Sequence, residues 1–344
     1  MKKTFVKHHI PALRPTLALG LVAITAAATL SIGRAADTAA ARAPRTVITG
    51  VNYHPLWAYR TTAERRAALD QVAGAGVRWL RIDMYWKDLE PRRGQLDPAL
   101  LRRIDTVIAE ARARRMQVLG VLWGTPPWAS GKQHPGTPPK NVRDFARFAG
   151  VMARRYRGRV AAWQLWNEPN QRRFFINGTP AYYVKMLRAA YPLVHPHARV
   201  VFAGLTRHDA RWLRRAYAAG ARGTFDVMAV HPYPQRHDAR PEGPVITGVK
   251  YVRAVMVSRR DPKPIWFTEL GWSTYKNGVT EPQQASYLLR SSRVLQRYPY
   301  VQRVFWFTLN DWPVENEWLA NLGLVRANGT EKPAFGALRR LLRG

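Results

Sequence analysis

The chain has 344 residues, 47% of them hydrophobic, which is enough for one large domain or two small ones with a sizeable core. It contains no cysteine, so disulfide bridges and thiolate metal sites are excluded. The formal net charge is +33, yet the basic residues are spread without a block of five or more and without a nucleic-acid-binding motif. The charge therefore favours a polyanionic partner, although not nucleic acid, and says nothing about the fold.

The N-terminal residues predict an export signal. A lysine-rich start precedes an uncharged run rich in Ala and Leu, Leu17–Ile32, and small residues between 33 and 43 offer cleavage sites. The alternative is an uncleaved membrane anchor, because the run approaches the minimum length of a spanning helix. We expect residues 1–35 to be a signal peptide and residues 36–46 a short linker. The product is then secreted, periplasmic or at the cell surface, with no stable membrane insertion after cleavage.

Residues 47–344 predict a regular alternation of strands and helices. Helices begin at the capping box Thr61-x-x-Glu64 and at Asp97-Pro98, and Thr179-Pro180 and Thr280-Glu281-Pro282 repeat the arrangement of a capping residue followed by proline. Eight apolar, strand-like runs lie between the helical patterns: 47–52, 79–84, 117–123, 160–166, 199–204, 226–231, 264–268 and 302–308.

Eight strand–helix units in one chain favour an α/β fold, a single (β/α)8 TIM barrel over residues 47–344. The alternative is an open doubly wound sheet, although GVNYHPLW after the first run does not fit a glycine-rich phosphate loop. In either architecture the chemistry belongs at the carboxyl ends of the strands.

Few of the 22 acidic residues end a predicted strand. Those that do are Asp83, Glu168, Glu269 and Asp311. Glu168 follows WQLWN and Glu269 follows PIWFT, so each leaves an apolar strand among aromatic residues. The fourth and seventh strands of a barrel lie across from each other, so these two carboxylates can face one another over a cleft. Such a pair is what glycoside hydrolysis requires.

The motifs around these residues resemble glycoside hydrolase clan A, the retaining (β/α)8 enzymes. WNEPN, HPYP and WFTELGW occur in the expected order, and RIDMYWKDLEPRRGQLD and VLWGTPPWAS resemble the second and third strand ends. The resemblance covers roughly residues 47–340 and is strongest to families 5 and 39 and to bacterial exopolysaccharide glycosidases. It implies that Glu168 is the acid/base and Glu269 the nucleophile.

The residues near the strand ends supply candidate substrate contacts. Asn167 can hydrogen-bond the sugar 2-hydroxyl, and Tyr233 can hold the nucleophile carboxylate and lower its pKa. His231 can contact the acid/base or the leaving group, and Trp306 resembles the clan's stacking platform under the reacting sugar. The remaining expected substrate-binding residues are Arg81 and Asp83, which can also form an ion pair at the barrel mouth, and Trp123.

These features predict a secreted, monomeric, retaining β-glycosidase that cuts a polysaccharide or oligosaccharide internally, without a metal or organic cofactor. A catalytically silent polysaccharide-binding barrel, a transglycosylase and a basic nucleic-acid- or surface-binding protein remain alternatives, although the export signal and the absence of a basic block argue against the last. The excess positive charge, together with Arg236, His237 and Arg240 in a long predicted loop at 234–248, leaves an acidic polysaccharide open as the substrate.

Overall fold

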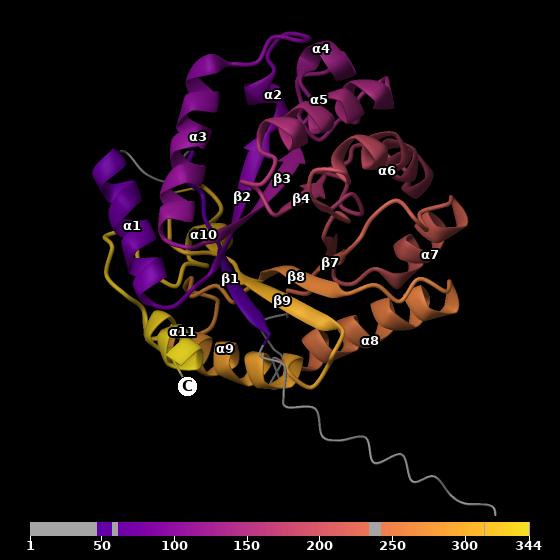
Figure 1. Ribbon diagram of the computed structural model, residues 1–344. Helices are drawn as coiled ribbons and strands as arrows, with labels where there is room; N and C mark the ends of the chain where they lie inside the picture. The colour runs from indigo at the N-terminus through magenta and orange to yellow at the C-terminus, as the bar shows by residue number, and fades with distance from the viewer. Residues whose placement is uncertain (1–46, 57–60, 234–241, 313, 344) are drawn as a thin grey trace, which may run out of the picture. The chain divides into compact units, whose positions relative to one another are not determined.

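The computed structural model describes residues 47–56, 61–233, 242–312 and 314–343, and these residues form an α/β fold around a parallel sheet (Figure 1). The predicted signal peptide and linker lie outside them. The strands are β1 Ile48–Asn52, β2 Trp79–Tyr85, β3 Gln117–Trp123, β4 Ala162–Leu165, β5 Arg199–Val201, β6 Leu205–Thr206, β7 Met228–His231, β8 Ile265–Leu270 and β9 Val301–Trp306. Eight of them overlap the eight predicted runs, and β6 is an additional strand directly after the fifth run.

Every strand except β5, which β6 follows directly, is followed by a helix, and Figure 1 shows these helices around the outside of the strands. The connecting helices are α1 Thr62–Gly74, α3 Pro98–Ala113, α5 Val142–Arg155, α6 Pro180–Val194, α7 Ala210–Ala218, α8 Glu242–Ser258, α9 Glu281–Leu295 and α11 Pro333–Arg343. Three short helices lie in the loops: α2 Trp86–Leu89, α4 Pro127–Ser130 and α10 Glu317–Ala320. None of the helices among these residues has the length and apolar character to cross a membrane.

The helix starts follow the predicted capping chemistry. The Thr61 side chain accepts from the Glu64 backbone N–H, and the Glu64 carboxylate accepts from the Thr61 N–H, which completes the capping box of α1. Asp97, Thr179 and Thr280 cap α3, α6 and α9 in front of a proline in the first turn. The predicted helix boundaries are thus confirmed at these positions.

All strand pairs in the sheet are parallel, in the order β5-β4-β3-β2-β1-β9-β8-β7-β6. The two end strands are consecutive in the chain and are separated only by residues 202–204. A parallel bridge also joins Val201 of β5 to Val227, which immediately precedes β7. The sheet therefore curls until its two ends approach each other.

The predicted fifth strand, residues 199–204, is wrong at its end, because the structure divides it into β5 and β6. The residue before β6, Gly204, lies against the His231 ring, and a Cβ atom there would be 1.9 Å from the imidazole Nε2. Only glycine allows so close an approach. The interruption of the strand therefore makes room for a candidate site residue.

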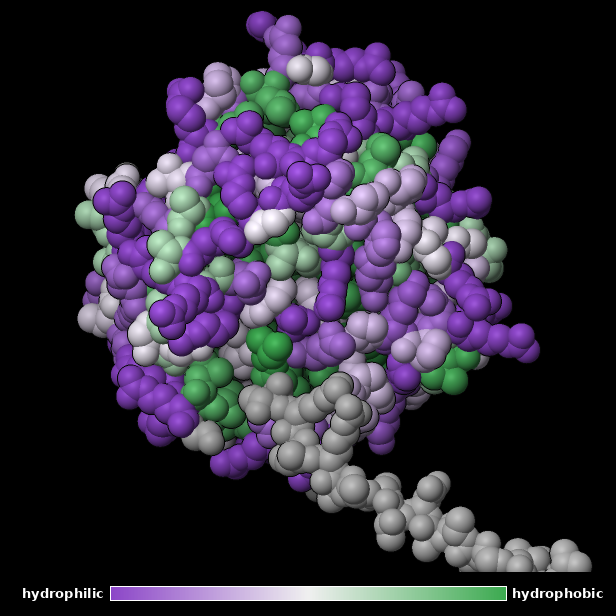
Figure 2. Space-filling model, in the orientation of Figure 1, coloured by the Kyte–Doolittle hydropathy of each residue, from purple (hydrophilic) through white to green (hydrophobic). Residues whose placement is uncertain are grey.

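Apolar side chains fill both faces of the sheet. The larger cluster packs the strands against the helices. The smaller cluster takes residues from most of the strands, namely Trp79, Leu119, Ala162, Val201, Val227, Ala229, Trp266 and Phe305. Hydrophilic residues cover most of the face drawn in Figure 2, and the hydrophobic residues there form small separate patches. The base of the molecule is thus a rigid scaffold on which strand-end residues are held.

Substitution of Gly120 tests this packing. Gly120 of β3 is in register with Trp163 of β4, and an added Cβ would lie 2.3 Å from the indole Cζ3. We expect Gly120→Ala to lower the free energy of unfolding by about 1–3 kcal/mol in urea titrations, because the indole must move inside a filled core. Gly74→Ala is the control, because its Cβ would meet no atom within 4 Å. A Gly120→Ala protein as stable as wild type would contradict the described packing.

Candidate active site

A cleft of about 700 Å³ lies at the carboxyl ends of the strands. Its lining includes Asp83 and Tyr85 of β2, Trp123 of β3 and Glu269 of β8, and it continues along the segments that follow β4, β6, β7 and β9. Asn167, Glu168 and Tyr233 line it as well. The structure therefore brings both predicted catalytic glutamates into one cleft.

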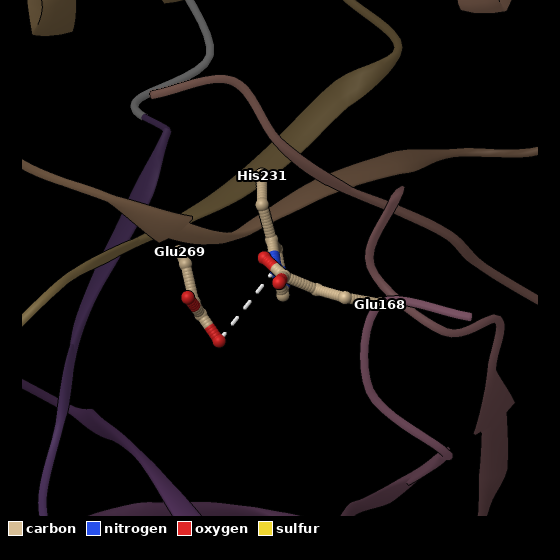
Figure 3. Close-up of side chains that lie close together, drawn as sticks. All are labelled: Glu168, His231 and Glu269. Carbon is tan, nitrogen blue, oxygen red and sulfur yellow. Dashed lines mark hydrogen bonds and ion pairs between the residues drawn. The ribbon is translucent and has the colours of Figure 1, made fainter. Parts of the chain in front are cut away.

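Glu168 and Glu269 approach each other on either side of His231, as Figure 3 shows. Both carboxylates are largely buried, at 4% and 6% exposed. An oxygen of each carboxylate and a ring nitrogen of His231 all lie within 4.8 Å of one another. The predicted position of Glu269 after the seventh strand is wrong by one step, because β8 continues to Leu270 and Glu269 lies inside it. Glu168 follows β4 with a φ of 43°, which turns its side chain into the cleft.

His231 connects Glu168 to the scaffold. Its Nδ1 lies 2.8 Å from Glu168 Oε1, and its Nε2 lies 2.8 Å from the Thr268 hydroxyl. Burial lowers the pKa of His231 to about 4, so the imidazole is neutral at neutral pH. An Nδ1–H that donates to the Glu168 carboxylate leaves Nε2 to accept from Thr268. His231 is fully buried and does not line the cleft, so the expectation that it contacts substrate is wrong, whereas the expected contact with Glu168 is present.

Arg81 joins the two sides of the site from below. Its Nη2 lies 3.0 Å from Glu269 Oε1 and donates to Asn167 Oδ1 at 2.8 Å, and its Nη1 donates to Asn52 Oδ1 at 2.6 Å. Nη1 also lies 3.6 Å from Asp83 Oδ2, so the predicted ion pair is present. Only 1% of Arg81 is exposed and it does not line the cleft. The predicted substrate contact by Arg81 is therefore wrong, and its guanidinium instead orients cleft residues.

Tyr233 donates from its hydroxyl to Glu269 Oε2 at 2.7 Å, as the sequence predicts. Burial raises the pKa of Glu269 above its ordinary value, and Arg81 and the Tyr233 hydrogen bond act against that increase. Burial also raises the pKa of Glu168, where Thr206, Arg173 and Arg81 act against it. The predicted lowering by Tyr233 is thus real, although burial outweighs it.

The other predicted contacts divide into two groups. Asp83 and Trp123 line the cleft, and the Trp123 indole donates to Asp83 Oδ1 at 3.2 Å. Trp306, the predicted stacking platform, is 1% exposed and belongs to the apolar cluster that packs the strands against the helices. It ends β9 and does not line the cleft, so this side chain is not available to a sugar.

The aromatic residues that line this side of the cleft follow β8 and β9 and were not among the predicted contacts: Trp272, Tyr275, Phe307, Trp312 and Trp318. The available signal was that Phe307 lies in the eighth apolar run and that the others follow the seventh and eighth runs. The predicted loop at 234–248 is wrong in its second half, because α8 begins at Glu242. Its residues Arg236, His237 and Arg240 lie outside the described part of the chain.

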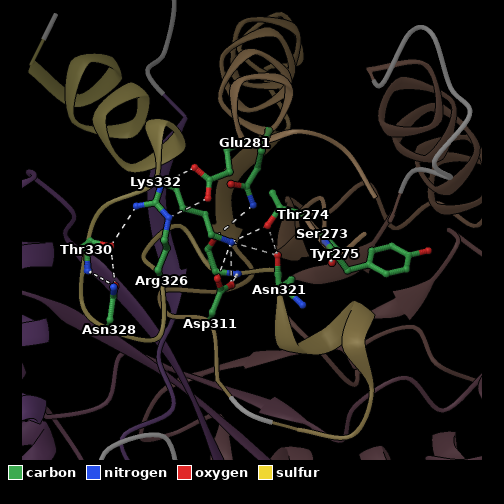
Figure 4. Close-up of polar contacts among 12 residues, drawn as sticks. Ser273, Thr274, Tyr275, Glu281, Asp311, Asn321, Arg326, Asn328, Thr330 and Lys332 are labelled. Atoms are coloured by element: carbon green, nitrogen blue, oxygen red, sulfur yellow. Dashed lines mark hydrogen bonds and ion pairs between the residues drawn. The ribbon is translucent and has the colours of Figure 1, made fainter. Parts of the chain in front are cut away.

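A buried ion pair supports the aromatic wall. Lys332 is 2% exposed, and its Nζ lies 2.7 Å from Asp311 Oδ2 and donates to Thr274 Oγ1 at 2.9 Å (Figure 4). Asp311 also accepts from the Gly323 N–H at 2.7 Å. Asp311 and Thr274 directly precede Trp312 and Tyr275 in the chain. Asp311, which the sequence places among the strand-end acids, therefore fixes two cleft loops and is not in the cleft lining.

Glu168, His231 and Glu269 also have the spacing of a metal-binding group. The contacts of this group suit another role, because the Arg81 guanidinium already lies 3.0 Å from Glu269 and His231 Nδ1 already faces Glu168. A divalent cation beside Arg81 would be repelled. The pair is better suited to acid–base and nucleophilic chemistry.

Comparison with known proteins also indicates a relation to glycoside hydrolases. The family model described as the glycosyl hydrolase catalytic core matches residues 159–337. No curated protein matches the chain. The predicted resemblance to clan A glycoside hydrolases is confirmed by this match and by solved structures of similar fold.

One such structure is a family 39 glycoside hydrolase from Bacteroides cellulosilyticus WH2, with a TM-score of 0.71 and 22% identity over 87% of this chain and 64% of that one. Another is the GH5_18 protein from Streptomyces cattleya in complex with GlcNAc, with a TM-score of 0.74 and 22% identity over 87% of this chain and 80% of that one. A third is an exo-β-1,4-mannosidase from Opitutaceae bacterium strain TAV5, with a TM-score of 0.68 and 20% identity over 86% of this chain and 59% of that one. The chain spans less than two thirds of the first and third of these proteins.

Removal of the Lys332 charge tests the support of the cleft wall. We expect Lys332→Met to lower the free energy of unfolding by about 3–5 kcal/mol, because Asp311 is left buried without its cation. Lys332→Met/Asp311→Asn should be more stable than the single variant, because no unpaired charge remains. Both values are read from chemical denaturation. A single variant with wild-type stability would show that the pair does not support the wall.

Proposed function

The protein belongs to the glycosyl hydrolase catalytic core family and is a glycoside hydrolase, and on this basis we propose that it is a retaining β-glycosidase with Glu269 as nucleophile and Glu168 as acid/base. The observation that carries the proposal is the close approach of the two buried carboxylates, with oxygens within 4.8 Å of each other. Retaining glycosidases hold their carboxyl groups about 5–5.5 Å apart, whereas inverting enzymes need about 6.5–9.5 Å to admit water.

The environments of the two glutamates differ in the sense that the proposal requires. Glu269 contacts the permanent cation Arg81 and accepts from Tyr233, and both favour the ionised form that attacks a sugar. Burial raises the pKa of both glutamates, but Glu168 faces the neutral His231 where Glu269 faces Arg81, which favours at Glu168 the protonated form that an acid needs. Two carboxyl groups in unlike surroundings can thus take unlike roles.

In the first step, Glu269 bonds to the anomeric carbon while Glu168 gives its proton to the leaving glycosidic oxygen. In the second step, Glu168 takes a proton from water, the water oxygen bonds to the anomeric carbon, and the Glu269–sugar bond breaks. The Asn167 amide oxygen accepts from Arg81, so its NH2 group is the part left to donate to the sugar 2-hydroxyl. No metal or organic cofactor is needed for these steps.

The parallel sheet supports a closed (β/α)8 barrel as the form of the fold. Residues 199–206 pair with β4 through β5 and with β7 through β6, and eight strand–helix units follow one another in the chain. If β5 and β6 are one interrupted strand, the order of the sheet closes on itself. This arrangement places all strand ends around one cleft.

The proposed substrate is a β-linked polysaccharide or oligosaccharide, cut internally by an exported, monomeric protein. Two aromatic groups support a cleft that holds several sugars: Tyr85, Trp123 and Phe174 on one side, and Phe307, Trp312 and Trp318 on another. Export rests on the sequence of residues 1–35 alone. Transglycosylation would pass through the same intermediate and is an outcome of the first test.

The catalytic roles are tested by three variants on a panel of neutral and acidic polysaccharides and on activated aryl β-glycosides. We expect Glu269→Gln to lower kcat by about four orders of magnitude. Glu168→Ala should retain activity on aryl glycosides with good leaving groups, and azide should restore turnover and give a β-glycosyl azide. Asp88→Asn, an exposed carboxylate outside the cleft, is the control and should behave as wild type.

Magnetic resonance of the first product should show retained configuration, and mass spectrometry should show oligosaccharides and not only monosaccharides. Full activity of Glu269→Gln or an inverted product would contradict the proposal. Products longer than the substrate would identify transglycosylation. Monosaccharides alone would show exo action.

The pH profile gives a separate test. Activity needs Glu269 ionised and Glu168 protonated, so kcat/KM falls at low pH as Glu269 is protonated and at high pH as Glu168 ionises. Tyr233→Phe removes a hydrogen bond that holds the pKa of Glu269 down. The acid limb of kcat/KM should therefore move to higher pH, while unfolding curves at the same pH values check that the fold is intact. An acid limb that stays in place would show that Tyr233 does not tune Glu269.

A further inference from the structure

We propose that Arg173 and Arg207 form an anion-binding wall beside Glu168, which receives an acidic, carboxylate-bearing sugar on the leaving-group side of the cleft. This inference rests on the proposed function, because the side of the leaving group is defined by the role of Glu168 as acid. Both arginines line the cleft, and both are largely exposed to it and to solvent.

The wall is built by two loops that are joined next to Glu168. The Asn170 amide donates to the Thr206 carbonyl at 2.9 Å and accepts from the Thr206 N–H at 3.1 Å. Arg207 directly follows Thr206, and Arg173 lies three residues after Asn170. The Gln171 N–H donates to the Glu168 carbonyl at 2.9 Å, which fixes the start of the same loop. Both arginines are therefore held on the side of the cleft that carries Glu168.

The backbone around Arg207 is held in an unusual conformation. Arg207 and His208 have φ values of 54° and 47°, a region that side chains other than glycine and asparagine seldom occupy. The Arg207 N–H donates to the His231 carbonyl at 3.1 Å, which ties this turn to the strand that carries the partner of Glu168. Such strain is concentrated at functional sites, where the surrounding structure maintains it.

The two guanidinium groups are free to bind an anion. Within the described ranges, neither Arg173 nor Arg207 has a carboxylate within ion-pair distance, whereas Arg65, Arg81 and Arg93 each do. Arg173 contacts an aromatic ring, with its guanidinium carbon 4.6 Å from the centroid of Phe174. A guanidinium held in this way presents its N–H groups in the geometry that suits a carboxylate.

The other charges of the cleft make the position of the wall specific. Asp83 and Glu269 line the cleft as well, and both lie near the buried Arg81. An acidic sugar on that side would meet two carboxylates, whereas beside Glu168 it would meet two unpaired cations. The Arg173 charge also lowers the pKa of Glu168, and a bound carboxylate would offset that effect. An acidic leaving sugar would thus help to keep Glu168 protonated until it donates.

The test uses binding, so it does not depend on turnover. The probes are β-1,4-linked tetrasaccharides of mannuronate and of mannose, and of glucuronate and of glucose, which differ within each pair only at C6. Calorimetry measures their Kd for the full chain carrying Glu269→Gln. We expect at least one acidic probe to bind about tenfold more tightly than its neutral partner. Addition of Arg173→Gln/Arg207→Gln should remove this preference and leave the affinity for neutral probes nearly unchanged.

The control for bulk charge adds Arg112→Gln/Arg214→Gln, which removes two exposed arginines of α3 and α7 outside the cleft lining. This variant should keep the preference for the acidic probe. Equal affinity for acidic and neutral probes, no binding of the acidic probes up to their solubility limit, or an equal loss in the control would each overturn the proposal. If wild type cleaves no glycan but the preference follows Arg173 and Arg207, the proposed function fails and the anion site stands.

Discussion

The buried guanidinium of Arg81 is the interaction on which the geometry of the site depends. It contacts Asn52 from β1, Asp83 on its own strand, Asn167 after β4 and Glu269 on β8. A buried cation needs paired charges and hydrogen-bond acceptors, so the position of each of these groups is constrained by the others. Glu269, the amide beside Glu168 and two strands of the scaffold therefore share one reference point. His231 extends the same arrangement to Glu168 without adding a charge.

The repeating order of strands and helices could be predicted because its causes are local. Apolar runs bounded by turn residues mark buried parallel strands, and a capping residue followed by proline marks the first turn of a helix. The placement of Glu168 and Glu269 in one cleft could be predicted for the same reason, since few acidic residues stand at the end of such a run. The places where prediction failed depend on contacts between distant segments. At the break in the fifth strand, Gly204 leaves the space that the His231 ring, from another strand, occupies.

Two misassigned side chains have different physical origins. Trp306 lies on a strand whose alternation directs each side chain to one of two sides, and the sequence does not reveal which side faces the cleft. Arg81 points to the same side of β2 as Asp83, but the residues that it contacts cover it. The aromatic residues of the cleft wall come from loops without periodicity, such as the segment between β9 and α10. Their positions follow from the Lys332–Asp311 pair, which joins residues 21 positions apart. No pattern in a single sequence marks such a pair, because the position of Asp311 at a strand end does not indicate its partner and Lys332 alone resembles a solvated loop residue.

The location of Lys332 also has a consequence for the order in which the molecule is completed during synthesis. The catalytic carboxylates belong to strands β4 and β8 and their adjoining loops, all of which leave the ribosome well before residue 332. The aromatic wall that faces them is fixed only when the last strand–helix unit arrives, since Lys332 is the residue that binds the two loops together. A nascent chain that lacks Lys332 would therefore lack the contact between these two loops, although Glu168 and Glu269 lie on earlier parts of the chain. The shape of this side of the cleft thus depends on the last strand–helix unit.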